Sequence, residues 1–192
     1  MSSSPANEDR RVLRTRTALR NALIASIFER GWERTSIRHV CAQAKIGRST
    51  FYTHFADKEE LLQSGFRDLR RLLRVAVTAQ GSRRRTLGFS LGLFEHAYEN
   101  RRLFRALVGK RSGQAIQRQF LGFVAEMVEE ELARQLAPGL ERDATVQYVA
   151  GAFNQLVIWW LESRKPLLPV QVDALFQRLT RPVLVAARAQ PR

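Results

Sequence analysis

The sequence contains a single cysteine, Cys41, so no disulfide can form within the chain. A lone cysteine on the apolar face of a predicted helix fits a reducing compartment. No apolar run approaches the roughly 18 residues that a membrane-spanning helix needs. Residues 1–9 are small and polar, unlike a secretory signal. These absences predict a cytoplasmic protein that does not enter a membrane.

Catalytic signatures are missing as well. The sequence has no Gly-rich phosphate loop, no H-E-x-x-H and no G-x-S-x-G. The three histidines lack the spacing of a metal site. Three successive acids, Glu129–Glu131, fall on different faces of a predicted helix, which favours a solvated edge over a catalytic pair. We therefore expect no enzyme activity, no metal and no cofactor.

Acidic residues are scarce relative to basic ones, with 18 Asp and Glu against 32 Lys and Arg and a formal net charge of +14. Such an excess favours a polyanionic partner, nucleic acid first and an anionic membrane surface second. The first predicted helix begins with Arg10, Arg11, Arg14 and Arg16 and no interleaved acid. Because positive charge is unfavourable near a helix N-terminus, this run indicates an external anion such as the DNA backbone, with a solvated helix end as the alternative.

The apolar pattern predicts an all-α fold. Hydrophobic residues make up 45% of the 192 residues, enough for a globular core. They recur at helical spacing without a competing strand pattern, which predicts about nine helices. The expected helices cover residues 10–30, 37–44, 48–55, 57–78, 86–99, 102–108, 115–136 and 142–163, and a last one starts at Pro169 and is kinked by Pro182.

Residues 35–62 organise the rest of the chain. The pair Thr35-Ser36 supplies cap residues that open a short helix, and Lys45-Ile46-Gly47 interrupts it. A second short helix follows, in which Phe51 and Phe55 share one face while small polar and cationic side chains occupy the others. A helix anchored by two Phe, with polar tips outward, is typical of a recognition helix that enters the DNA major groove.

Asp57 and Glu60 then resemble a capping box that opens a long third helix. With this third helix, residues 33–62 resemble the helix-turn-helix of TetR-type transcriptional regulators. The matching positions are Thr35-Ser36-Ile37, Ala44, Ser49-Thr50-Phe51-Tyr52, His54-Phe55 and Lys58-Glu59. One position departs, because the family usually has Gly in the turn where this chain has Lys45. A left-handed turn residue costs a non-Gly side chain about 1 kcal/mol, so the turn is either strained or built differently.

The resemblance implies a set of DNA-contacting residues. They are Thr35, Ser36, Arg38, Gly47, Arg48, Ser49, Thr50, Tyr52, His54 and Lys58. Lys58 lies in the first turn of the third helix, where its ammonium and the free helix amides are expected to hold a phosphate. The implied layout is a disordered arm over 1–9, a helix-turn-helix DNA-binding domain over 10–56, and a helical ligand-binding and dimerisation domain over 57–192.

The resemblance also implies a homodimer on a palindromic operator, in which the last two helices of each chain form a four-helix bundle. The predicted helix 142–163 is apolar around most of its circumference, which offers a surface for this contact. The interface candidates are Val149, Phe153, Leu156, Val157, Trp160, Leu175, Leu179 and Val183. The alternative is that helix 142–163 is simply central to the domain core.

A ligand pocket among the middle helices is the remaining implication. The candidates are Phe89, Phe94, Tyr98, Phe104, Phe120, Phe123 and Trp159, for each of which core packing is the alternative. The same region carries Arg101, Arg102, Arg105, Arg111 and Arg118 and few acids. We therefore expect a small hydrophobic or aromatic effector, with a carboxylate preferred over a cation.

These expectations combine into a DNA-binding repressor that a small hydrophobic ligand releases from a palindromic operator. Two alternatives remain from the sequence. One is an activator or general DNA binder without an effector. The other is a helical protein associated with an anionic membrane surface, which the basic composition alone would also allow.

Overall fold

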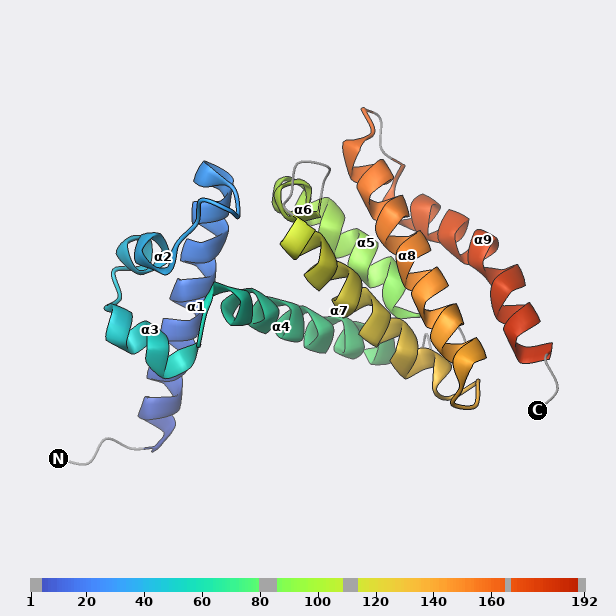
Figure 1. Ribbon diagram of the computed structural model, residues 1–192, viewed down its shortest axis with the longest axis horizontal. Helices are drawn as coiled ribbons and strands as arrows, with labels where there is room; N and C mark the ends of the chain where they lie inside the picture. Colours follow the sequence, from blue (N-terminus) through green and yellow to red (C-terminus); the bar gives the residue numbers. More distant parts are fainter. Residues whose placement is uncertain (1–4, 80–85, 109–113, 165–166, 190–192) are drawn as a thin grey trace. The chain divides into compact units, whose positions relative to one another are not determined.

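The computed structural model describes residues 5–79, 86–108, 114–164 and 167–189. Within these ranges the chain forms nine α-helices and no strand, which confirms the all-α prediction (Figure 1). The helices are α1 (Pro5–Arg30), α2 (Ile37–Ala44), α3 (Arg48–His54), α4 (Lys58–Ala79), α5 (Phe89–Glu99), α6 (Arg101–Val108), α7 (Gln114–Leu132), α8 (Leu140–Glu162) and α9 (Pro169–Ala189).

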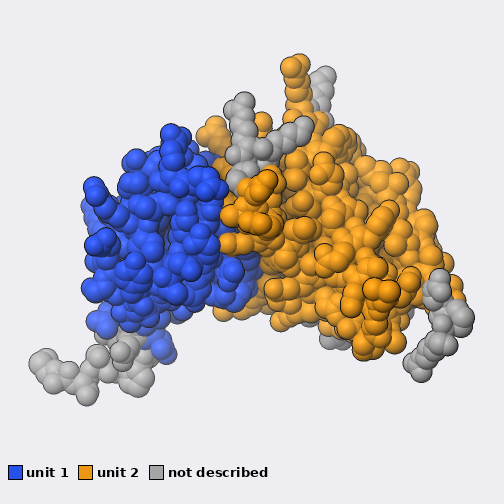
Figure 2. All heavy atoms as spheres, viewed as in Figure 1, with its two compact units in different colours: residues 1–68 blue, residues 69–192 orange. Residues whose placement is uncertain are grey.

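The chain divides into two compact units, residues 1–68 and residues 69–192 (Figure 2). The division falls inside α4, whereas the sequence places the boundary before this helix. Helix α4 therefore belongs to both units. At the other end, α1 begins at Pro5, so residues 5–9 are helical rather than part of the expected arm. Pro suits the first helical turn, and the acids Glu8 and Asp9 favour a helix N-terminus, which accounts for the earlier start.

In the first unit, α1 supplies an apolar stripe that α2 and α3 cover. Leu19, Leu23 and Ile27 are buried on α1, and Phe51 and Phe55 are buried opposite. The core side chains repeat at three- and four-residue intervals, as a single helix face requires. Cys41 is buried among them, and this burial raises the pKa of its thiol. A buried, protonated thiol packs as a small apolar side chain.

Aromatic side chains fill the core of the second unit. The ring centroids of Phe94 and Phe153 lie 4.8 Å apart, and those of Phe153 and Phe176 lie 5.0 Å apart. Trp160 meets Phe94 edge-on at 5.4 Å and donates its indole N–H to the carbonyl of Leu167 at 2.8 Å. Helix α8, which lies between α7 and α9, supplies two of these rings (Figure 1). Helix α8 is thus central to this core.

The three acids Glu129–Glu131 do not form the solvated edge expected from the sequence. Glu129 pairs with Arg142 of α8 at 2.9 Å. Glu130 pairs with Arg70 and Arg74 of α4. Glu131 accepts the backbone N–H groups of Gly88 and Phe89, at 3.0 and 3.3 Å, at the start of α5. The solvated-edge prediction was wrong because successive helix faces meet different neighbours here, so α7 is tied to three other helices.

Candidate nucleic-acid interface

Helix α2 begins with the capping arrangement that its sequence predicts. The Ser36 hydroxyl accepts the backbone N–H of His39 at 3.3 Å, and the imidazole Nδ1 of His39 accepts the backbone N–H of Ser36 at 3.4 Å. Two of the free amides at the helix start are thereby satisfied. Thr35 is buried, and its hydroxyl donates to the carbonyl of Gly31 at 2.8 Å. Ser36 therefore stands at the surface, whereas Thr35 fixes the preceding loop.

The turn between α2 and α3 is strained rather than rebuilt. Lys45 adopts the left-handed conformation, with φ 55° and ψ 40°, and its N–H closes α2. This is the turn position at which TetR-type regulators usually have Gly. Gly47, by contrast, has an extended backbone, and a Cβ there would meet only Ser49 and Thr50 side-chain oxygens at 3.8 and 4.0 Å. The protein itself does not require glycine at 47, so the missing side chain leaves room for something outside the chain.

Helix α3 separates into an anchoring face and an exposed face. Phe51 and Phe55 are buried, with ring centroids 5.9 Å apart. Tyr52 is 57% exposed and meets the Phe51 ring edge-on at 5.5 Å, which orients it. The other exposed side chains of this helix are Arg48, Ser49, Thr50 and Thr53. A helix held by two Phe thus presents donors and acceptors of several lengths on its outer face, which suits base edges in a groove.

The start of α4 confirms the predicted Asp57 cap, while Glu60 bonds one residue earlier than in a standard capping box. The Asp57 carboxylate accepts the N–H of Glu60 at 2.7 Å, and Glu60 accepts the N–H of Ala56 at 2.7 Å. Lys58 makes contacts that the sequence did not indicate. Its ammonium donates to the carbonyls of Trp32 and Thr35, at 3.1 and 3.0 Å, and lies 4.4 Å from the Trp32 ring centroid. Lys58 therefore holds the loop between α1 and α2.

The structure thus gathers most of the predicted DNA-contacting residues on exposed parts of α2 and α3. Those with exposed side chains are Ser36, Arg38, Arg48, Ser49, Thr50 and Tyr52, with the bare Gly47 between them. His54 and Lys58 are half-buried. No pattern in the sequence singled out Trp32, which is buried under the Lys58 ammonium. Its role depends on a cation twenty-six residues away, which periodicity does not reveal.

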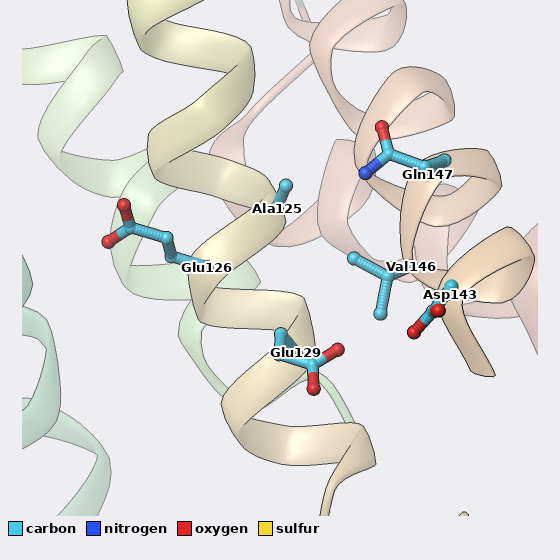
Figure 3. A pocket seen from close by; sticks show the side chains of 6 residues that line it. All are labelled: Ala125, Glu126, Glu129, Asp143, Val146 and Gln147. Atoms are coloured by element: carbon cyan, nitrogen blue, oxygen red, sulfur yellow. The ribbon is translucent and has the colours of Figure 1, made fainter. Parts of the chain in front are cut away.

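The predicted ligand-pocket residues fall into two groups. Phe89, Phe94, Phe104, Phe120 and Phe123 are buried in the core of the second unit. Tyr98 and Trp159 are exposed. A shallow groove of about 280 Å³ between α7 and α8 is lined instead by Ala125, Glu126, Glu129, Asp143, Val146 and Gln147 (Figure 3). Figure 3 shows Val146 and Asp143 facing Ala125 and Glu129 across this groove. Its acidic rim does not resemble the aromatic pocket expected from the sequence.

The predicted dimer residues also divide. Val149, Phe153, Val157 and Trp160 are buried within the chain, in line with the alternative of a core helix. Leu156, Leu175 and Val183 are partly exposed, and Leu179 is 62% exposed. Other large apolar side chains exposed on these two helices are Leu140, Tyr148, Trp159, Val170 and Val185. Helices α8 and α9 therefore leave apolar surface uncovered next to a filled core.

Two wider features bear on partners. Among the described residues, no helix is both long and apolar enough to cross a membrane. The same residues contain no group of three His, Cys, Asp or Glu side chains placed to hold a metal ion.

Comparison with known families covers most of the chain. Residues 19–64 match the family described as bacterial regulatory proteins, tetR family. Residues 86–182 match the family described as transcriptional regulator C-terminal region, which by itself covers half of the chain. The two matched stretches correspond to the helix-turn-helix unit and to the helices from α5 to α9.

Individual relatives match different shares of the chain. The uncharacterized HTH-type transcriptional regulator YxbF of Bacillus subtilis (strain 168) is 44% identical over 57 residues, which are 29% of this chain and 15% of that protein's length. A TetR transcriptional regulator from Streptococcus agalactiae 2603V superposes with a TM-score of 0.65 at 22% identity, over 92% of this chain and 99% of that one. The TetR-family repressor FadR of Thermus thermophilus, solved with lauroyl-CoA, gives 0.56 at 16% identity, over 92% and 96%. At these identities the two structures show a shared fold.

Proposed function

The chain belongs to the tetR family of bacterial regulatory proteins and is a DNA-binding transcriptional regulator, and from this we propose that it is a ligand-released repressor of a palindromic operator. Three parts make up the proposal. Helix α3 reads base edges, α8 and α9 pair two copies, and a small hydrophobic molecule bound in the second unit lowers affinity for the operator.

The exposed face of α3 is the observation that carries the DNA-binding part. Arg48 follows the bare Gly47, so its guanidinium stands at the N-terminal end of the helix, where base contacts of recognition helices concentrate. Arg48 suits a guanine edge, because its planar fork can donate two bonds to O6 and N7. Thr50 and Tyr52 offer hydroxyls, and the proposal assigns phosphate contacts to Ser36, the N-cap of α2, and to Arg38, both of which are exposed.

The exposed apolar side chains of α8 and α9 support the homodimer. Trp159 is 51% exposed, and Tyr148 lies eleven residues earlier on the same helix, separated from it by the small residues Gly151 and Ala152. Small residues between aromatic ones let a second helix approach closely. Leu179 of α9 is the corresponding exposed anchor. Covering this surface with a second copy buries aromatic and aliphatic area, which is the usual content of a homodimer interface. A two-fold dimer also fits a palindromic site.

The ligand is proposed from the family and from composition. Thermus thermophilus FadR holds lauroyl-CoA in the same fold, which supports a hydrophobic effector in the second unit. Within that unit Arg101 donates to the carbonyl of Ser163 at 2.9 Å, so it is occupied at the end of α8. Arg102, Arg105 and Arg118 are exposed, and Arg111 lies outside the described residues. The preference for a carboxylate over a cation therefore depends on those exposed guanidinium groups.

If the bound ligand lowers the affinity of the dimer for DNA, bound DNA must lower its affinity for the ligand by the same free energy. Helix α4 is the structural element for this coupling, because it starts at the capping box of the DNA-binding unit and ends in ion pairs with α7. The ligand is proposed to favour a spacing of the two heads that does not fit the operator.

The experiment is selection of bound fragments from the source genome, repeated with matched acidic, neutral and cationic aromatic compounds that stabilise the protein in a thermal-shift screen. A single enriched palindrome that is lost with an acidic or neutral compound is the expected result. Enrichment without any palindrome would remove the operator proposal. Release by cations alone would reverse the charge argument, and release by none would favour the regulator without an effector.

A further inference from the structure

After Glu8 and Asp9, the next turns of α1 carry a cluster of arginines. Between residues 10 and 28 there is no Asp or Glu, and the five cations are Arg10, Arg11, Arg14, Arg16 and Arg20. The structure gives two of them internal partners. Arg20 pairs with Asp68, and the Arg16 guanidinium lies 4.8 Å from the centroid of the Phe55 ring. Two of the five arginines therefore have partners within the first unit.

The remaining three, Arg10, Arg11 and Arg14, have exposed side chains, and among the described residues they have no carboxylate partner. Arg10 and Arg14 are four residues apart, so they share one face of the helix, opposite the buried stripe that contains Leu19 and Leu23. Like charges at this spacing repel each other. An external anion would offset this repulsion.

The position of α1 connects this cluster to the DNA-binding surface. Phe55 ends α3, so the stacking of Arg16 on its ring fixes α1 beside the C-terminal end of the proposed recognition helix. Arg10 precedes Arg16 by six residues, a rise of about 9 Å along the helix axis. Figure 1 shows these N-terminal turns of α1 projecting past the end of α3. The cluster thus continues the interface beyond the reach of α3 itself.

We propose that Arg10, Arg11 and Arg14 bind DNA backbone phosphates that flank the base pairs contacted by α3. Guanidinium groups suit this partner, because their planar donors match phosphate oxygens in pairs. The contacts add affinity without sequence preference, since phosphates carry no base information. The proposal rests on the proposed function only for the identity of the base-reading helix. The competing partner of the same charge is an anionic membrane surface.

The test compares two variants with equal charge change. The first is R10Q/R11Q/R14Q, and the control is R134Q/R164Q/R178Q, whose side chains are exposed in the second unit. Arg and Gln have similar helix propensity, so both variants should keep their helical circular dichroism. Affinity for a random-sequence duplex is measured over a salt series, which needs no operator. Each lost phosphate contact flattens the slope of log K against log salt by about 0.9. The first variant should lose up to about three contacts per protomer, and the slope of the control should change little.

The second measurement uses the selected operator core with and without random-sequence flanks. The wild type should gain affinity from the flanks, and R10Q/R11Q/R14Q should lose that gain while it keeps its base preference in the core. An unchanged salt slope, an equal slope change in the control, or lost base preference would each overturn the proposal. Loss of binding to phosphatidylglycerol vesicles with an unchanged duplex slope would assign the cluster to membranes. Failure to select any operator would contradict the proposed function and leave the random-duplex result valid.

Discussion

At the scale of single residues, the helix-turn-helix combines strain in its turn with open space at the start of α3. Lys45 adopts a left-handed backbone conformation although it carries a Cβ, whereas Gly47, which could adopt one at little cost, has an extended backbone. Backbone strain of this kind persists where the surrounding structure fixes it, and it concentrates at functional sites. Here α2 is held by its Ser36 cap and its buried Val40 and Cys41, and α3 is held by its buried Phe51, so the short turn must absorb the mismatch.

Replacing Lys45 tests this strain. Lys45→Gly should raise the free energy of unfolding by up to about 0.5 kcal/mol, because relief of about 1 kcal/mol in the left-handed region exceeds the added entropy of the unfolded chain. Lys45→Ala removes the same ammonium but keeps a Cβ, so it should leave stability nearly unchanged. Ala42→Gly, within α2, should lower stability by about 1 kcal/mol. Urea unfolding of the three variants measures this, and destabilisation by Lys45→Gly would contradict the argument.

Arg48 tests direct readout. A side chain that bonds a base edge contributes roughly 1–3 kcal/mol of discrimination, so Arg48→Ala should weaken operator binding about tenfold to hundredfold. The preference should relax at one symmetric pair of operator positions and stay intact elsewhere. Competition binding against a panel of single-base operator variants is the measurement, with the exposed Arg164→Ala of the second unit as control. Unchanged affinity and preference would mean that α3 is not the reading helix.

Lys58→Ala tests whether Lys58 binds a DNA phosphate. The structure predicts that this variant affects both DNA binding and stability. Its ammonium has three donors, of which two bond the carbonyls of Trp32 and Thr35. We expect the third to bond a DNA phosphate. Lys58→Ala should therefore weaken binding to all duplexes alike, flatten the salt dependence and lower the melting temperature as the loop loosens. Thr35→Ser keeps the carbonyl contacts and serves as a control. A sequence-selective loss with an unchanged salt slope would argue against a phosphate contact.

At the scale of elements, the sequence predicted what depends on periodicity and missed what depends on neighbours. The apolar stripe of α1, the Ser36 cap of α2 and the Asp57 cap of α4 follow from local patterns and were found, whereas the part that His39 plays in capping α2 was not. The roles of Glu129–Glu131 depend on which helices lie beside α7, and no pattern within α7 contains that information. Likewise the all-round apolar character of α8 did not reveal that Trp160 faces its own core whereas Trp159 faces outward.

Glu131 gives this element-level view a pH dependence. Burial raises the pKa of its carboxyl above the usual value of 4.5, although the N–H groups of Gly88 and Phe89 oppose the shift. The folded chain then keeps a proton that the unfolded chain has lost, so the free energy of unfolding falls as pH rises from about 4.5 through the raised pKa. Glu131→Gln keeps an acceptor at the start of α5 and removes this titration.

The stability of Glu131→Gln relative to the wild type should therefore increase across that pH interval and then level off. Chemical unfolding at a series of pH values gives the difference directly. Glu95→Gln, on the exposed side of α5, controls for the loss of one negative charge. A difference that stays flat would show that folding does not shift the pKa of Glu131. A difference that falls with rising pH would show that the fold favours the charged form.

At the scale of the whole molecule, the proposed function requires two copies. Paired variants can decide whether the apolar residues of α8 and α9 belong to the core or to the interface. Leu179 is exposed in the single chain, so Leu179→Glu should leave each chain folded. In the proposed dimer the new carboxylate would be buried without a partner, which costs about 3–5 kcal/mol. We expect a folded monomer that no longer binds a palindromic duplex. Trp160→Glu should instead unfold the second unit, because Trp160 is fully buried and bonded to Leu167. Light scattering and circular dichroism separate the two outcomes, with Val170→Glu at the exposed start of α9 as a control for added charge. An intact dimer of folded Leu179→Glu would exclude the exposed face around Leu179 as the interface. A folded monomer of Trp160→Glu would instead assign the interface to the face of α8 that contains Trp160.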